Sequence, residues 1–191
     1  MKIIAIVAMG AVVGITARAE RNVRVYVNND LNTRGVMYQA QERAARAFAE
    51  VGVRIEWHTG RPPSAQPERE PAIVIRLAGN TPEDYRPGAL AFAKVYEGVH
   101  ITVFWDRIER QPRFAPLGVV LAHVLVHEIT HILQGVDRHS ESGVMKSQWT
   151  AEDHRAMVSK PLPFSSLDVE LIQRGLDSRT DARARAASNR F

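Results

Sequence analysis

Two histidines and a glutamate at helical spacing are the residues of this sequence best suited to chemistry. They lie in the run His127-Glu128-Ile129-Thr130-His131. Because an α-helix turns about 100° per residue, the imidazoles of His127 and His131 project from one face, one turn apart, where both can bind one metal ion. Glu128 projects beside that face, where its carboxylate can accept a proton from a metal-activated water. The motif therefore predicts metal-assisted hydrolysis.

A catalytic zinc site needs a third protein ligand and one open position. Gly135 predicts the end of the helix, so the chain can turn back there and bring His139 to the ion. We favour His139 as the third ligand. Asp137 is its main rival, and Glu141 and Glu152 are further alternatives.

The helix that must carry the motif is predicted from Pro116 to about Gln134. Proline is favoured at the first position of a helix. The leucine, isoleucine and most valine side chains of this segment fall on one broad arc, and the histidines fall mostly on the opposite side. We expect the apolar face to pack in the core and the polar face to line a cleft. His123 lies one turn before His127 and is expected on the cleft side as a supporting residue.

The segments before this helix predict an α+β fold. The order strand, helix, strand favours a right-handed crossover and a parallel pair, and Glu97-Gly98 is typical of the tight turn of a hairpin. We expect a mixed, twisted sheet with an antiparallel edge strand, packed on the crossover helix and the active-site helix. The predicted strands cover 23–27, 53–57, 73–77, 90–96 and 100–105, the crossover helix covers 33–50, and two further helices begin at Thr150 and Ser166.

The first nineteen residues predict a secretory signal peptide. Lys2 precedes an apolar run over 3–15, and Ala17-Arg18-Ala19 offers small residues at the two positions that a signal peptidase reads. The run is short for a bilayer span, which favours cleavage over an uncleaved anchor. We expect a secreted or periplasmic protein with a signal peptide at 1–19, a single domain at 20–173, and no membrane contact after cleavage.

Composition excludes several classes of protein. The 191 residues include no cysteine, which excludes a disulfide scaffold, a cysteine nucleophile and thiolate metal sites. The net charge of +4 falls to +2 without residues 1–19, and the segment 174–191 holds five arginines and two aspartates. The remaining body is therefore close to neutral, which argues against nucleic-acid binding. The arginine-rich segment 174–191 is expected to be a disordered tail.

The motif and its surroundings resemble the metzincin clan of zinc metallopeptidases. That clan has the pattern His-Glu-x-x-His-x-x-Gly-x-x-His followed by a methionine-containing turn. The matching positions are His127-Glu128-x-x-His131, Gly135, His139-Ser140 and Gly143-Val144-Met145, and the last two are most similar to the matrixin-like branch. The glycine comes one residue later than in the clan pattern and the third histidine two residues later, so Asp137 stands where the third ligand falls by count.

The resemblance implies a zincin-like fold and a zinc-dependent endopeptidase. It implies Zn²⁺ bound by His127, His131 and His139, with Glu128 as general base and later proton donor, and Met145 as a hydrophobic floor beneath the metal. The antiparallel edge strand would bind an extended peptide or protein substrate by strand addition. We expect a monomer. The alternative is a secreted zinc-binding protein without peptidase activity; Glu128 argues against it, because a structural metal site needs no general base.

Overall fold

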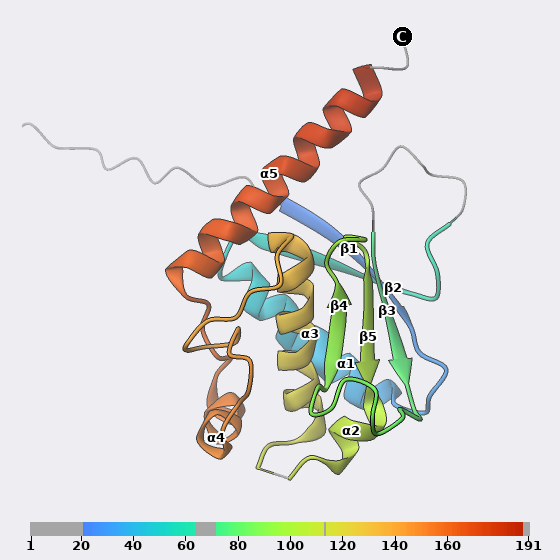
Figure 1. The fold of residues 1–191 in the computed structure, drawn as a ribbon, viewed down its shortest axis with the longest axis vertical. Coiled ribbons are helices and arrows are strands. Elements are labelled where there is room, and N and C mark those ends of the chain that lie inside the picture. Colours follow the sequence, from blue (N-terminus) through green and yellow to red (C-terminus); the bar gives the residue numbers. More distant parts are fainter. Residues whose placement is uncertain (1–20, 64–71, 113, 189–191) are drawn as a thin grey trace, which may run out of the picture.

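A five-stranded sheet forms the centre of the protein in the computed structural model, which describes residues 21–63, 72–112 and 114–188 (Figure 1). The strand order is β2-β1-β3-β5-β4. All neighbouring strands are parallel except β4, which pairs antiparallel with β5 at the edge of the sheet. This confirms the predicted mixed sheet with an antiparallel edge strand. The strands are β1 (Arg21–Asn28), β2 (Val53–Thr59), β3 (Ile73–Ala78), β4 (Ala91–Lys94) and β5 (His100–Phe104).

Alternation of apolar and polar residues decides which face of the sheet is covered. In β3 the side chains of Ile73, Ile75 and Leu77 are buried while those between them are more exposed. The helix α1 (Arg34–Ala49) connects the parallel strands β1 and β2, and its apolar residues recur at helical spacing. The helices α1 and α3 pack against each other and supply the core over this face.

The helix α3 (Leu117–Gln134) lies beside α1, between the edge strand β4 and the helices α4 (Ala151–Ser159) and α5 (Ser166–Ser188), and carries the histidine motif (Figure 1). Every residue of α3 after Leu117 is buried, because the helix packs against α1, β4 and α5. Its length and hydropathy would also suit a membrane span, yet nearly all of it is buried inside this fold. The prediction that one face of α3 packs in the core while the opposite face is open to a cleft is therefore only partly correct. The cleft reaches only part of the helix.

Two short helices refine the sequence-based expectations. The helix α4 (Ala151–Ser159) begins at Thr150, whose side chain and that of Asp153 each accept the other's backbone N–H, as in a capping box. The helix α2 (Trp105–Arg110) was not expected, because the strand was predicted to run to Trp105. The predicted signal peptide at 1–19 lies outside the described residues.

The last helix, α5 (Ser166–Ser188), contradicts the disordered tail expected at 174–191 over its described part, 174–188. Alanine and arginine favour helix formation, and Arg174 donates to Glu170 one turn earlier. Arg179 donates to the carbonyls of Ile132 and Gly98, at 3.1 and 2.8 Å. Charge composition predicted a solvated chain, but these contacts hold the segment against α3 and the β4–β5 turn.

Candidate metal centre

Three imidazoles meet beside the edge strand. His127 and His131 project from α3, and His139 comes from the loop that follows it. One ring nitrogen of each lies within 4.8 Å of the others. The Nε2 atoms of His127 and His131 are 3.0 Å apart, close to the roughly 3.3 Å that separates two nitrogens on one tetrahedral zinc ion with Zn–N bonds of about 2.05 Å. The cluster thus has the composition and spacing of a zinc site.

Backbone carbonyls orient the two helical imidazoles. Nδ1 of His127 lies 2.9 Å from the carbonyl oxygen of Val144, and Nδ1 of His131 lies 3.2 Å from that of Val136. A carbonyl only accepts, so each Nδ1 carries the proton and each Nε2 presents a lone pair. Two lone pairs facing each other at 3.0 Å repel unless a cation lies between them. This arrangement fits a metal ion, because carbonyl partners of this kind are what orient metal-binding histidines.

Burial keeps these histidines neutral. The pKa of His127 is lowered to about 4, mainly by burial and next by the charge of the neighbouring His131. The hydrogen bond to the carbonyl of Val144 raises this pKa, but by less. Burial also lowers the pKa of His131. Metal binding requires unprotonated imidazole nitrogens, so both rings are competent ligands at neutral pH. His139 differs, since its side chain is exposed.

The loop after α3 turns sharply enough to return His139 to the helix. Gly135 has a φ of +69°, and its N–H donates to the carbonyl of His131 at 3.0 Å, which ends the helix in the left-handed conformation that glycine favours. Ser140 N–H then donates to the carbonyl of Met145 at 2.8 Å. Met145 is fully buried. The two extra residues relative to the clan pattern are thus absorbed between the helix end and this turn.

The rival third ligands lie outside the converging group among the described residues. Asp137 lines the cleft, but the metal-compatible group among the described residues consists of the three histidines. Glu141 and Glu152 are exposed and lie outside that group as well. His123 does not line the cleft: its Nδ1–H donates to the carbonyl of Val119 and its Nε2 accepts from the N–H of Leu162. His123 therefore lies outside the cleft, but its ring stands edge-on to that of the lining residue Trp149, with centroids 6.2 Å apart, so it supports the cleft only indirectly.

Glu128 lies at the inner side of the cleft and is 7% exposed. Burial is the main cause that raises its pKa to about 8, and the charge of Asp137 acts in the same direction, while the N–H of Ala93 and the charge of Arg86 act in the opposite direction. A carboxyl group whose pKa lies near neutrality is suited to exchange protons during catalysis. The bond to Ala93 joins Glu128 directly to the edge strand.

The cleft has a volume of about 510 Å³ and opens between two walls. One wall is the segment from Arg86 to Ala93, which leads into and forms β4, and the other includes Trp149 from the segment before α4. The ring of Trp149 stands edge-on to that of His127, with centroids 5.7 Å apart. Neither Arg86 nor Trp149 could be found from a local sequence signal, because neither belongs to a spaced motif. His154, from α4, also lines this wall and is buried.

Comparison with known proteins supports the architecture. No family model matches the chain, and no curated protein sequence matches it. The fold is similar to the crystal structure of archaemetzincin from Methanopyrus kandleri, with a TM-score of 0.53 and 17% sequence identity, over 85% of this chain and 99% of that one. At this identity the likeness concerns the fold, and no matrixin-like branch is confirmed. The chain therefore has an α+β, zincin-like fold similar to that of archaemetzincin, with a histidine cluster suited to a metal ion.

Proposed function

We propose that this protein is a zinc-dependent metallopeptidase that hydrolyses peptide bonds. The observation that carries the proposal is the set of three converging imidazoles with Glu128 beside them, at the open edge of a sheet. The ligands would be His127, His131 and His139. The likeness of the fold to archaemetzincin supports the same conclusion.

The residues around the cluster suit peptide hydrolysis. A bound zinc ion would supply Lewis acidity, polarising the carbonyl of the scissile bond. Glu128 would take a proton from the attacking water and later deliver it to the leaving amine, which a carboxyl group with a near-neutral pKa can do in both directions. Trp149 covers His127 from one side and limits the water that reaches the ligands.

The edge strand β4 would bind the substrate backbone. Leu90 accepts from the N–H of Phe104 in β5, so by alternation the backbone groups of Ala91 and Ala93 face the open edge. The bond from Ala93 to Glu128 agrees with this direction. An extended peptide that adds to this edge passes directly in front of Glu128 and the imidazoles.

Further proposals rest on the sequence. The signal-peptide pattern at 1–19 supports export to the periplasm or the outside of the cell. A peptide or protein substrate, a monomeric state, and no contact with nucleic acid or membrane belong to the same proposal. The pattern His139-Ser140 with Met145 supports a place near the matrixin-like branch.

Replacing Glu128 by glutamine tests the function. The variant keeps all three imidazoles, so we expect one zinc per chain, as in the wild type, and loss of casein cleavage. Equal cleavage by the variant would refute the role of Glu128. One zinc in both proteins without cleavage by either would favour the alternative, a zinc-binding protein without peptidase activity.

Zinc titration of two further variants tests the ligand set. We expect His139→Ala to lose much more zinc affinity than Asp137→Ala, because only His139 belongs to the group of converging donors. The reverse ranking would move the third ligand to Asp137.

A further inference from the structure

Arg86 has an unusual backbone conformation at the rim of the cleft. Its φ of +49° is in the left-handed region, the only such value for a residue other than glycine within 21–63, 72–112 and 114–188. Such a conformation costs a residue with a β-carbon about 1 kcal/mol or more. Pro87 follows, and a residue before proline is restricted further. Strain of this kind persists only where the surrounding structure enforces it.

Arg107 enforces this conformation from α2. Its guanidinium donates to four carbonyls of the rim loop, those of Pro82, Tyr85, Arg86 and Ala89, at 2.9, 2.5, 2.6 and 2.9 Å. The same guanidinium lies over the ring of Phe104 in β5, 4.7 Å from its centroid. The rim loop is therefore tied to the sheet through one side chain, and the position of Arg86 is fixed relative to β4.

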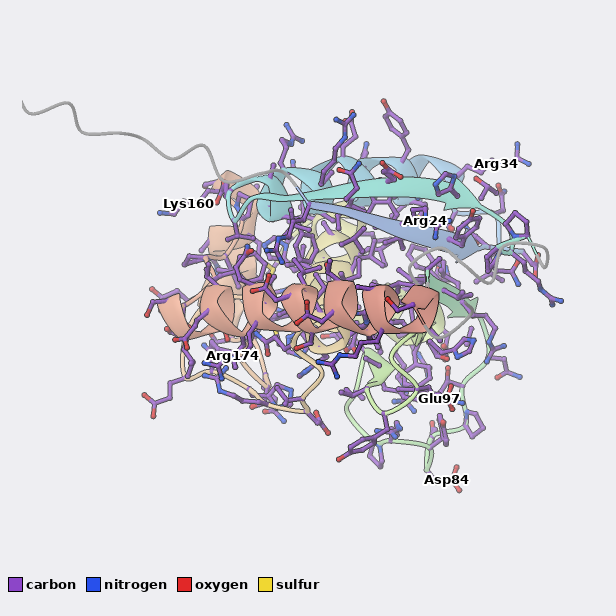
Figure 2. The ribbon with its side chains drawn as sticks, turned by 90° about the horizontal axis from the view of Figure 1, so that it is seen from above. Arg24, Arg34, Asp84, Glu97, Lys160 and Arg174 are labelled. Carbon is purple, nitrogen blue, oxygen red and sulfur yellow. The ribbon has the colours of Figure 1, made fainter. Side chains whose placement is uncertain are left out.

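The side chain of Arg86 is directed to the edge strand. Its guanidinium lies 4.2 Å from the centroid of the Phe92 ring, over β4, and the residue lines the cleft. Within the described part of the chain, no carboxylate forms an ion pair with Arg86. The neighbouring Asp84 extends outward from the molecule (Figure 2). The Arg86 guanidinium at the cleft thus forms no ion pair among these residues, although its charge acts on the Glu128 carboxyl.

The other cations near the cleft are engaged. Lys146 lines the opposite wall and lies 2.5 Å from the carboxylate of Asp153. Lys94, at the far end of β4, pairs with Glu97 at 2.9 Å. Arg86 is therefore the cation best placed to receive a carboxylate from a bound peptide.

The strand register specifies which substrate residue meets Arg86. Backbone groups of Ala91 and Ala93 face the open edge, while the Phe92 side chain lies on the other face of the strand and lines both the cleft and the groove beneath the sheet. A peptide residue opposite Phe92 directs its side chain to the same face as Phe92. The residues on either side of it, opposite Ala91 and Ala93, direct theirs toward α3 and the imidazoles.

We propose that Arg86 is a specificity-determining residue that binds a carboxylate of the peptide substrate, one residue away from the side chain that enters the cleft. This rests on the proposed peptidase function. The guanidinium stacked on Phe92 keeps its hydrogen-bonding edge free for bidentate contact with a carboxylate. The carboxylate is supplied either by an aspartate or glutamate side chain or by the C-terminus of the peptide, which share this chemistry.

Peptide binding to the Glu128→Gln variant tests the proposal independently of cleavage. The probes are fluorescein-labelled, C-terminally amidated octapeptides rich in alanine, each with one glutamate at a successive position, and their glutamine counterparts. We expect glutamate to lower Kd about tenfold at one position, with no effect at its immediate neighbours. A glutamine peptide with a free C-terminus at that same position distinguishes a terminal carboxylate from a side-chain carboxylate. Wild-type cleavage of the same peptides reports separately on the peptidase function.

Matched variants identify Arg86 as the cause. Asparagine tolerates the left-handed conformation, so Arg86→Asn, added to Glu128→Gln, removes the charge without forcing the loop to move. We expect it to abolish the preference for glutamate and Arg86→Lys to keep part of it. Arg174→Gln on α5 removes the same charge far from the rim loop (Figure 2) and is expected to retain the preference. The proposal would be overturned by an unchanged preference for glutamate in Arg86→Asn. It would equally be overturned if the Glu128→Gln parent bound glutamate and glutamine peptides alike, or bound none of the peptides.

Discussion

Asp168 holds the loop that carries the exposed third histidine, and its replacement by asparagine separates that role from general stability. Asp168 is fully buried near the start of α5. Its carboxylate accepts from Arg138 Nη1 and Ser140 Oγ, both at 2.8 Å, and from Ser165 Oγ and N–H, at 2.7 and 2.9 Å. Arg138 and Ser140 are the immediate neighbours of His139 in the chain, so one carboxylate fixes the backbone on both sides of that ligand.

The expected loss of stability in Asp168→Asn follows from how deeply Asp168 and its partners are buried. Removing one member of a buried ion pair costs about 3–5 kcal/mol. The side chain of Arg138 is 32% exposed, so it can regain part of its hydration, and asparagine keeps one acceptor oxygen. We therefore expect Asp168→Asn to lower the free energy of unfolding by about 2–3 kcal/mol. Zinc affinity should fall about 10- to 100-fold, as is usual when a group that orients a ligand is removed.

The assays are urea unfolding of the zinc-free protein and zinc titration against a competing chelator. Asp153→Asn is the matched control: it also breaks an ion pair and a helix cap, with Lys146 and Thr150, but it flanks none of the three converging histidines. We expect Asp153→Asn to lose stability and keep its zinc affinity. An Asp168→Asn protein that loses stability while binding zinc as tightly as the wild type would refute the positioning role.

The pH dependence gives an independent check. Burial alone would raise the pKa of Asp168, but hydrogen bonds from Ser165, Arg138 and Ser140 outweigh it and hold the pKa below its ordinary value of 3.8. A carboxyl group with a lowered pKa stabilises the fold above its unfolded-state pKa, and that contribution is lost as the pH falls through the folded-state pKa. The difference between wild type and Asp168→Asn should therefore be constant from pH 7 to 5 and shrink below about pH 4. A difference that persists unchanged at lower pH would contradict the electrostatic explanation.

Two further predictions concern the packing of the helices and a buried histidine. A β-carbon at Gly175 in α5 would collide with the carbonyl oxygen of Leu133, so Gly175→Ala should cost about 1–3 kcal/mol of stability in urea unfolding. Gly35→Ala in α1, where nothing lies within 4 Å of the added β-carbon, should gain about 0.5–1 kcal/mol. Equal effects of the two substitutions would contradict the packing of α5 on α3. Burial lowers the pKa of His123 from 6.5 to about 4, so the unfolded chain binds its proton first and stability is lost as the pH falls from 6.5 toward 4, by about 2 kcal/mol at pH 5. His123→Gln should reduce the loss between pH 7 and 5 by that amount in the zinc-free protein, and an identical slope would show that His123 takes up its proton in the fold as readily as in the unfolded chain.

Local periodicity predicted the parts of the site that depend on local geometry. The spacing of His127 and His131 on a helix follows from four residues of sequence, and α3 begins and ends where Pro116 and Gly135 predicted. The capping box at Thr150 is equally local. These features require no knowledge of the rest of the fold.

The position of His139 could not be derived in the same way. Counting along the clan pattern put Asp137 at the position of the third ligand and left it as the rival of the favoured His139, because the length of a loop does not specify its path. That path depends on the bond from Ser140 to Met145 and on the buried Asp168, which lies 28 residues after Ser140. Asp168 belongs to the pattern Ser165-x-x-Asp168, a capping box in which each side chain accepts the other residue's backbone N–H. That local pattern marks the start of a helix and carries no information about the loop of His139.

The prediction of a disordered tail at 174–191 was wrong over the described residues 174–188 for a related reason. Charge content describes how a chain interacts with water, but it does not reveal whether another part of the fold offers acceptors at the right distance. Arg179 finds two such acceptors, the carbonyl of Ile132 at the end of α3 and that of Gly98 in the β4–β5 turn. Arg179 was predicted to be solvated, but its two contacts hold this part of α5 against the rest of the fold.

These contacts give α5 a role in the site although none of its residues lines the cleft. Through Asp168 it holds the loop of His139, and through Arg179 it joins the last turn of α3 to the hairpin that contains the edge strand. The helix α3, the loop of His139 and the hairpin that contains β4 are therefore all positioned by α5. Since a catalytic geometry tolerates errors of only about 0.5 Å, a third ligand that is itself exposed needs such support from a buried neighbour. The lengthened loop is compatible with a metal centre because the carboxylate of Asp168 fixes both residues that flank His139.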